Sequence, residues 1–215
     1  MKKILYSVAL AACCMGTMTS CSDFLDASNK SNVTDKQTFA TKEGLNNLVN
    51  DAYQHLQNVY AAPLFTSCFS AGTDMYADAR NKMNEALNTY ETLTPENTDI
   101  KNLYTYLYSG IRAANSVSYY AQTAQVDDKT KGQLVGEARV LAAYEYYLLV
   151  NNFGGVPIMK DFLTTADTGY PKSSSEDVYA YIISELEDVI SKNVLQASTA
   201  TKGGGRISQE TAKAI

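Results

Sequence analysis

Residues 132–155, GQLVGEARVLAAYEYYLLVNNFGG, contain the stretch of sequence that decides the fold. Apolar residues recur across positions 129–152 at the spacing of three and four that places them on one face of an α-helix. The run stops at Gly154 and Gly155, where glycine can adopt the left-handed conformation that ends a helix, and Pro157 blocks its continuation. We therefore predict one long helix over this region, with the following residues on its apolar face: Leu134, Ala138, Leu141, Ala142, Leu148 and Leu149.

Three further runs show the same periodicity, at residues 41–60, 97–123 and 175–194, and no segment alternates strongly enough to be a strand. Only a few residues around Val126 separate the run at 97–123 from the long helix predicted at 129–152, so these two helices should form an antiparallel hairpin. Alanines would let their backbones approach closely. The sequence thus predicts an all-α fold with helical hairpins and two long irregular loops, 61–95 and 155–174. A short helix is compatible with residues 83–87, and Ser208 suits the N-cap of a last helix beginning near Glu210. The alanines that would let the two hairpin helices approach closely are Ala113, Ala114, Ala138, Ala142 and Ala143.

The N-terminus reads as a secretory signal, because Lys2 and Lys3 precede an apolar run from Ile4 to Met15. That run is shorter than the ~20 residues a membrane-spanning helix needs. Small residues followed by Cys21 are typical of a bacterial lipoprotein, in which the thiol is joined to diacylglycerol. Cys13 is a rival, since the residues before it match the lipoprotein pattern well, and an ordinary signal is the other alternative. We expect a signal peptide at 1–20, a flexible tether at 21–36 and a helical domain at 37–215.

Charge and composition exclude several classes of function. Removal of Lys2 and Lys3 with the signal lowers the formal charge from −5 to −7, which argues against nucleic acid or an anionic membrane surface as a partner. Of the four cysteines only Cys68 would remain beside the lipidated one, so no disulfide between side chains is expected. His55 is the single histidine, which excludes a Ser-His-Asp or Cys-His arrangement and a multi-histidine metal site. Adjacent acidic pairs suit helix ends and exposed faces better than a glycosidase cleft, and no phosphate-binding glycine loop is present. We predict no enzyme, no metal and no cofactor.

Tyrosine is the unusual component, with 16 residues against no tryptophan. Tyr53, Tyr104 and Tyr108 lie at helical-face spacing, which favours the core. The neighbours Tyr119 and Tyr120, like the pair at 146–147, cannot all point inward because adjacent helical residues diverge by about 100°. Some rings must face solvent or a partner. Such rings suit stacking on sugars and suit protein interfaces equally well.

The segment from Gly136 through Asn151-Asn152-Phe153-Gly154-Gly155 to Ile158 resembles the SusD/RagB family of outer-membrane glycan-binding lipoproteins. Further similar stretches follow the family's order: 21–26 (CSDFLD), 107–115 (LYSGIRAAN), 171–174 (PKSS) and 205–208 (GRIS). The resemblance implies an all-helical fold of tetratricopeptide-like hairpins that support a less regular ligand-binding region. Family members are much longer, so the sequence looks like their N-terminal part, truncated at its C-terminus.

The resemblance also implies a function. Such proteins capture nutrient at the cell surface and deliver it to a SusC-like TonB-dependent transporter, so we expect a glycan ligand and an outer-membrane protein held by its lipid anchor only. Asp23 resembles the signal that sends these lipoproteins to the cell exterior. A helical interaction protein that docks on the transporter, with peptide or another nutrient as cargo, is the alternative.

Residues 73–81 resemble the family loop that lends polar groups to the ligand site. Asp74, Tyr76, Asp78 and Arg80 are therefore the predicted ligand-binding residues, with the charged groups bonding sugar hydroxyls and Tyr76 stacking. A loop ordered only by its own side chains is the alternative. The absence of tryptophan departs from the sugar platforms of the family.

Structural roles are expected for four other residues of the family-like segments. Gly136 should permit close helix contact, Glu137 and Arg139 should bond neighbouring loops, and Asn115 should bond backbone across the hairpin.

Overall fold

The computed structural model describes residues 38–61, 63–76, 85–165, 169–201 and 205–215, all within one unit, Asp35–Ile215. The predicted signal peptide, Cys21, Cys13 and the predicted tether lie outside the described residues.

Four long helices form the body of this unit, each where periodicity predicts it: α4 (Lys42–Tyr60), α7 (Thr98–Ala121), α8 (Asp128–Phe153) and α9 (Ser175–Lys192). Every one of them begins at a polar N-cap whose side chain accepts a hydrogen bond from a free backbone N–H of the first turn. At α9 this becomes a reciprocal capping box between Ser174 and Asp177. The acidic pairs at 127–128 and 176–177 therefore lie at helix N-termini, as predicted. The caps are Thr41, Asn97, Asp127 and Ser174.

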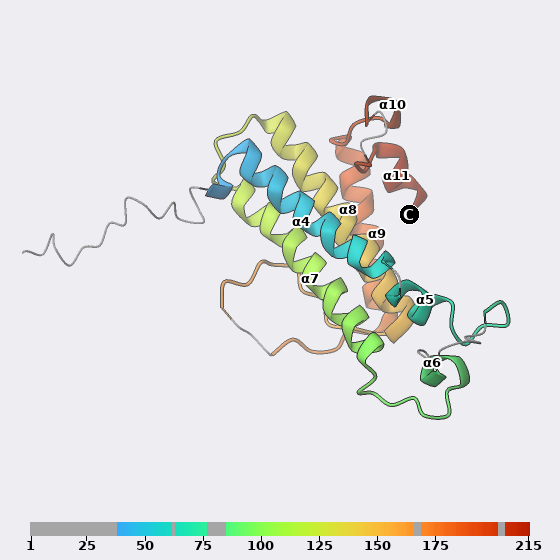
Figure 1. Ribbon diagram of the computed structural model, residues 1–215. Coiled ribbons are helices and arrows are strands. Elements are labelled where there is room, and N and C mark those ends of the chain that lie inside the picture. Colours follow the sequence, from blue (N-terminus) through green and yellow to red (C-terminus); the bar gives the residue numbers. More distant parts are fainter. Residues whose placement is uncertain (1–37, 62, 77–84, 166–168, 202–204) are drawn as a thin grey trace, which may run out of the picture. The chain divides into compact units, whose positions relative to one another are not determined.

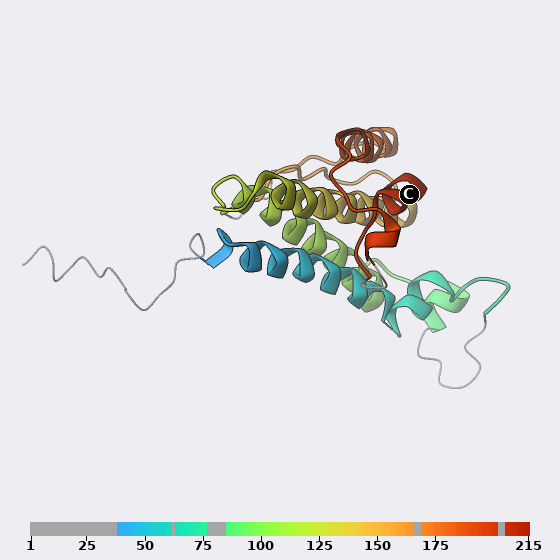
Figure 2. The ribbon, with the colours of Figure 1, turned by 90° about the horizontal axis from the view of Figure 1, so that it is seen from above.

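The long helices pack in a simple order, α4 against α7, α7 against α8 and α8 against α9, while α4 also reaches α8 (Figures 1 and 2). Residues 122–127 join α7 and α8 into the predicted hairpin. The five alanines predicted at close helix contacts are all buried, and they lie in one core with Leu45, Leu107, Ile111, Leu141 and Leu149. Small side chains on both helices allow this close approach.

Shorter helices occupy the connections. α5 (Leu64–Phe69) lies within a stretch for which only irregular structure was predicted. α6 (Glu85–Thr89) overlaps the short helix predicted at 83–87. α10 (Ser198–Thr201) precedes α11 (Gln209–Ala214), which packs on α9. Ser208 caps α11 as predicted, accepting a bond from the backbone N–H of Thr211 at 3.1 Å. In the described part of the chain no helix combines the length and hydropathy needed to cross a membrane.

The end of α8 differs in detail from the prediction. Gly154 has φ +71° and ψ −140°, so it uses a conformation open to glycine but is not a left-handed helical cap. The chain then turns into an irregular connector, which we define as the described residues 155–165 and 169–174. Its irregular structure is as predicted, although Val156 is buried rather than at the surface.

The residues given structural roles show two confirmations and two corrections. Glu137 bonds Arg206 in the irregular segment before α11, as predicted. A Cβ on Gly136 would lie 2.9 Å from Val194 Cγ2, so glycine does permit close contact there. Arg139 bonds Glu185 at 2.6 Å and also Asp188, both on α9, so the prediction that it bonds a loop is wrong. Asn115 bonds the backbone of the connector rather than the opposite helix of the hairpin. Both corrections arise because α9 and the connector pack back on the hairpin.

Candidate functional site

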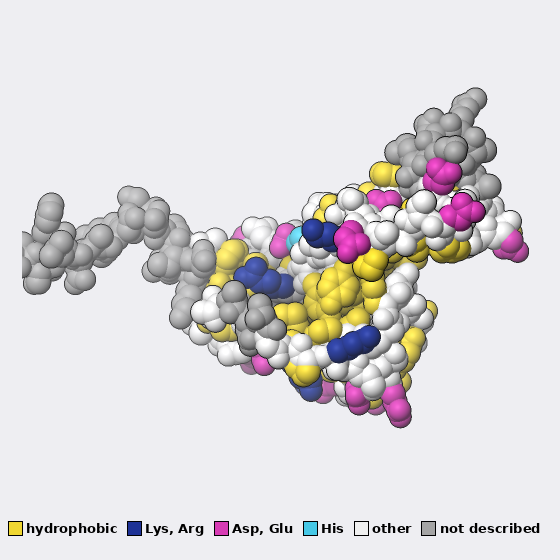
Figure 3. Space-filling view, turned by 90° about the horizontal axis from the view of Figure 1, so that it is seen from below, with side chains coloured by type: hydrophobic (Ala, Val, Ile, Leu, Met, Phe, Trp, Pro, Cys, Tyr) yellow, Lys and Arg dark blue, Asp and Glu magenta, His cyan; other side chains and the backbone are white. Residues whose placement is uncertain are grey.

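The outer face of α7 and the connector enclose a hollow that we call the α7 hollow. It consists of three adjoining pockets, of about 490, 350 and 290 Å³, and Arg112 lines all of them. Figure 3 views the unit from the side of the connector and shows hydrophobic side chains gathered between Lys and Arg side chains. The largest pocket is lined by Tyr104, Thr105, Tyr108, Ser109, Arg112, Pro157, Met159 and Tyr170.

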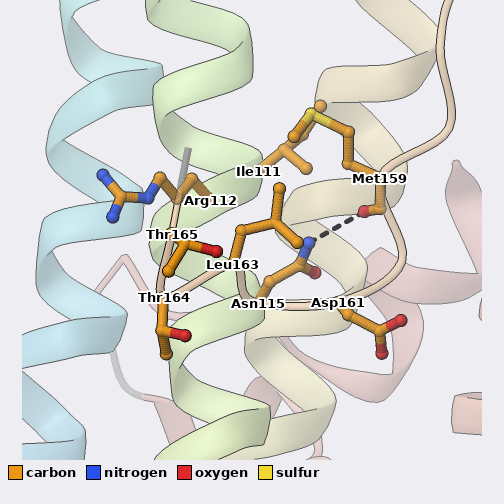
Figure 4. Close-up of a pocket in the computed structure, with 8 residues that line it drawn as sticks. All are labelled: Ile111, Arg112, Asn115, Met159, Asp161, Leu163, Thr164 and Thr165. Carbon is orange, nitrogen blue, oxygen red and sulfur yellow. Dashed lines mark hydrogen bonds between the residues drawn. The ribbon is translucent and has the colours of Figure 1, made fainter. Parts of the chain in front are cut away.

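Hydrogen bonds from three side chains hold the connector against the hairpin and so form this hollow. The Tyr108 hydroxyl donates to the carbonyl of Pro157 at 2.7 Å, and the Asn115 amide donates to the carbonyl of Met159 at 2.8 Å (Figure 4). From α8, the hydroxyl of the fully buried Tyr146 accepts from the backbone N–H of Met159 at 2.7 Å. An irregular segment needs such partners, because its backbone groups have no ladder of their own.

Arg112 is exposed and extends over the ring of Phe162, with its guanidinium carbon 5.4 Å from the ring centroid. Phe162 in turn contacts Tyr119 and Tyr120, at centroid distances of 5.4 and 5.9 Å. The planar guanidinium is thereby oriented without an ion pair, since no carboxylate among the described residues bonds it. In Figure 4 it points away from Asp161, toward α4.

The tyrosines of the hollow provide ring faces and neutral hydroxyls. Tyr104 exposes 36% of its surface, so the prediction of a core position is wrong for this residue. The centroid of its ring lies 4.7 Å from the centroid of the Tyr108 ring. Burial, and then the neighbouring Tyr104 hydroxyl, raise the pKa of Tyr108, which keeps this phenol protonated and able to donate. The pair Tyr146 and Tyr147 divides as expected, with Tyr146 buried and Tyr147 41% exposed.

The described residues of the predicted ligand-binding loop, 73–76, lie elsewhere, after α5. Asp74 is exposed there, and Tyr76 is partly exposed and bonds the carbonyl of Thr73 through its backbone N–H. Asp78 and Arg80 lie outside the described residues, so their placement remains a prediction. Neither Asp74 nor Tyr76 lines the α7 hollow.

A separate pocket of about 380 Å³ lies near this loop, between α5, α6 and the hairpin. Cys68 lines it, and burial raises the pKa of its thiol to about 11, so the thiol is protonated at neutral pH. The hydroxyl of Tyr90, which also lines this pocket, donates to the carbonyl of Gly72 at 3.3 Å.

The α7 hollow could have been noticed in the sequence. Tyr104, Tyr108, Arg112 and Asn115 recur every three or four residues and so share one face of α7. That face carries aromatic and polar groups rather than aliphatic ones. Its pairing with the connector depends on tertiary packing and has no local signal.

The chemistry of the hollow suits binding. It offers ring faces, hydroxyls and a guanidinium. Among the described residues no group of three or more His, Cys, Asp or Glu is placed to hold a metal ion. Such a surface can stack on and hydrogen-bond a polar ligand that has flat apolar faces, which is the nature of a sugar ring.

Comparison with known proteins gives the family. A family model described as "Starch-binding associating with outer membrane", SusD-like, matches residues 23–213. A SusD-like protein of Formosa agariphila is 28% identical over 190 residues, which cover 86% of this chain and 36% of that protein. This chain thus spans little more than a third of that relative's length.

Solved structures agree. Surface glycan-binding protein A from Bacteroides uniformis has a TM-score of 0.66 and 26% identity, covering 79% of this chain and 39% of its own. The Bacteroides thetaiotaomicron protein of the same name, in complex with laminarihexaose, has a TM-score of 0.62 and 21% identity, with 80% and 37% coverage. These likenesses confirm the all-α fold with tetratricopeptide-like hairpins. The chain therefore belongs to the SusD-like family of starch-binding proteins that associate with the outer membrane, as its sequence motifs predict.

Proposed function

We propose that the chain belongs to a cell-surface lipoprotein that binds glycan and delivers it to a SusC-like TonB-dependent transporter. The observation that carries the glycan part is the pocket of about 490 Å³ that the exposed Tyr104 ring and Arg112 both line, in a member of a starch-binding family. Binding and transfer need no catalytic group, which agrees with a family of carbohydrate-binding proteins and with the prediction that the chain is not an enzyme.

Two surfaces are candidates for the sugar contact. The α7 hollow offers the ring of Tyr104 and the hydroxyls of Thr105 and Ser109. The loop that carries Asp74, Tyr76, Asp78 and Arg80 is the surface that the family resemblance predicts. A related protein carries laminarihexaose, which supports glycan as the ligand class. The two surfaces make separate predictions for mutants, so one set of variants can assign the site.

The binding experiment uses calorimetric titration of the chain with laminarihexaose and maltohexaose. Tyr104→Ala should weaken binding about two- to tenfold, since a ring contact contributes roughly 0.5–1.5 kcal/mol beyond its area. Tyr147→Ala is the matched control, because Tyr147 is similarly exposed at 41% and lies outside the hollow. A loss confined to an Asp74→Ala/Tyr76→Ala variant would assign the loop instead. If neither oligosaccharide binds the unaltered chain, the glycan proposal fails and peptide cargo becomes the better one.

The anchor belongs to the same proposal. A signal peptide at 1–20, a tether at 21–36 and a helical domain at 37–215 would place the binding surfaces outside the outer membrane, with the acyl chains on Cys21 as the only membrane contact. Labelling of cells with radioactive palmitate tests this. Label should enter the chain, persist in Cys13→Ala and disappear in Cys21→Ala. Label lost only in Cys13→Ala would move the anchor to Cys13.

A further inference from the structure

The α7 hollow contains a cation whose charge the described residues leave unmatched. The other two arginines in the described part of the chain each bond a carboxylate, Arg139 that of Glu185 at 2.6 Å and Arg206 that of Glu137 at 3.0 Å. Arg112 instead lies over the ring of Phe162. A guanidinium needs oppositely charged or hydrogen-bonding partners when a ligand covers it and removes its water.

Two described acids line the hollow, and neither forms an ion pair with Arg112. Asp161 lines the 290 Å³ pocket but points away from the guanidinium (Figure 4). Asp51 lines the 350 Å³ pocket, and its carboxylate lies 3.8 Å from the imidazole Nε2 of His55. The hollow therefore keeps a planar donor group that is oriented by an aromatic ring and available to an incoming anion.

The position of Arg112 also sets how a ligand would extend. Because all three pockets share this residue, a group bound to it has space on both sides. The exposed ring of Tyr104 lies in the pocket of about 490 Å³, and Phe39, Tyr120 and Phe162 line the one of about 350 Å³. An anionic unit at Arg112 could thus be flanked by neutral rings that stack on these aromatic side chains.

We propose that the α7 hollow selects acidic glycans, with Arg112 binding the carboxylate of a uronic acid unit. This inference rests on the proposed glycan-binding function and adds the class of sugar. The guanidinium fork matches the two oxygens of a carboxylate and can bond both. The aromatic surroundings favour the remainder of a sugar over a small, fully hydrated anion.

The test compares two trisaccharides of equal length, trigalacturonic acid and the neutral maltotriose, titrated into the chain at one fixed salt concentration. The acidic sugar should bind more tightly. Arg112→Gln should weaken its binding about tenfold or more, because a charge-assisted bidentate contact is lost, and should change maltotriose binding about twofold or less. Arg112→Lys keeps the charge but loses the planar fork. Its affinity for trigalacturonic acid should therefore lie between those of the unaltered chain and Arg112→Gln.

Lys160→Gln is the matched control for the charge. Lys160 is also a cation over a ring, 5.6 Å from the centroid of Tyr181, but it lines none of the three pockets. Its removal should leave the affinity for trigalacturonic acid within about twofold of the unaltered chain, as expected of an exposed charge that does not line the hollow. An equal loss in Lys160→Gln and Arg112→Gln would mean that only net charge matters and would overturn the proposal.

Other outcomes separate the two levels of inference. If maltotriose and trigalacturonic acid bind equally well, selection by Arg112 is wrong while glycan binding stands. If neither binds, the proposed function itself fails. Tighter binding of triglutamate than of trigalacturonic acid would assign the cation to an acidic peptide and would overturn the sugar class.

Discussion

The guanidinium of Arg206 lies 3.0 Å from the carboxylate of Glu137, which has no exposed surface. The Tyr53 hydroxyl donates to the same carboxylate at 3.4 Å and accepts from the backbone N–H of Ile207 at 2.8 Å. Arg206 also bonds Asn46 and Asn50. The segment before α11 is thus fastened to α4 and α8. Burial raises the pKa of Glu137, while hydrogen bonding from Gln133 and the charge of Arg206 oppose that rise.

Removal of this cation should destabilise the fold. Arg206→Met leaves Glu137 buried without its charge partner, and we expect the free energy of unfolding to fall by about 2–4 kcal/mol. Urea unfolding measures the change, with the exposed Lys101→Met as the control. The double variant Arg206→Met/Glu137→Gln should recover part of the loss. Strictly additive losses would show that the two residues are not coupled.

Glu145 should make stability depend on pH. Its side chain has no exposed surface, and its two oxygens have no hydrogen-bond partner among the described residues. Burial raises its pKa well above the usual value. The folded state therefore holds a proton that the unfolded state releases above its ordinary pKa of about 4.3. Stability is fully present below that pH and falls as pH rises toward the folded pKa, by at most about 1.4 kcal/mol per pH unit.

The measurement is urea unfolding at pH 5 and pH 8. Glu145→Gln should flatten the pH dependence and gain stability relative to the unaltered chain at pH 8. Glu187→Gln, at an exposed position of α9, should keep the original slope. Parallel pH profiles for Glu145→Gln and the unaltered chain would rule out this role.

Gly110 provides the space for Glu145. A Cβ at this position would lie 1.7 Å from Glu145 Oε1, so Gly110→Ala forces α7 away from α8 and should destabilise the chain by about 1–3 kcal/mol. Gly132→Ala, in α8, is the matched control, because its Cβ would meet Val194 Cγ1 at 3.3 Å and alanine favours helix. Thermal unfolding compares the two. Equal losses would contradict the steric explanation, and Glu145→Ala should partly relieve Gly110→Ala.

Tyr146 and Tyr147 offer a neighbouring pair for testing the connector. Tyr146→Phe removes the group that bonds the backbone N–H and carbonyl of Met159, at 2.7 and 3.3 Å, and should cost about 1–3 kcal/mol. Tyr147→Phe changes an exposed side chain and should stay within about 0.5 kcal/mol. Calorimetric unfolding gives both values. Similar losses in the two variants would mean that the connector does not depend on this hydroxyl.

The long helices could be predicted because each carries apolar residues at helical spacing and begins at a polar N-cap. The region around Leu64–Phe69 could not, since six residues give too little periodicity to separate a helix from a loop. The ending of α8 at Gly154 was predicted, whereas its ψ depends on where the connector must go. Tyr104 fits a buried stripe by spacing, yet it lies at the edge of that stripe and opens onto the hollow.

The candidate site, like the fold, could be predicted only in part from the sequence. The residues of the α7 face are visible in the sequence, but their meeting with Phe162 and Met159 depends on how an irregular segment folds back. Arg139 illustrates the difficulty, because its partners Glu185 and Asp188 lie one helix farther along the chain. Long-range pairing of this kind has no local pattern. The loop residues Asp74, Tyr76, Asp78 and Arg80 remain predictions from family resemblance.

The fastening at Arg206 has a consequence for the order of folding. Tyr53 and Ile207 are 154 positions apart, and Asn46 and Arg206 are 160 apart. The helices α4, α7 and α8 all precede Arg206 in the sequence, and contacts between successive helices close shorter loops than the contacts of Arg206 do. We expect the bundle to close first around Glu137 with only neutral partners, and the charge of Arg206 to be added late. We infer that the partly folded chain is most vulnerable to proteases between the packing of α8 and the docking of residues 205–208.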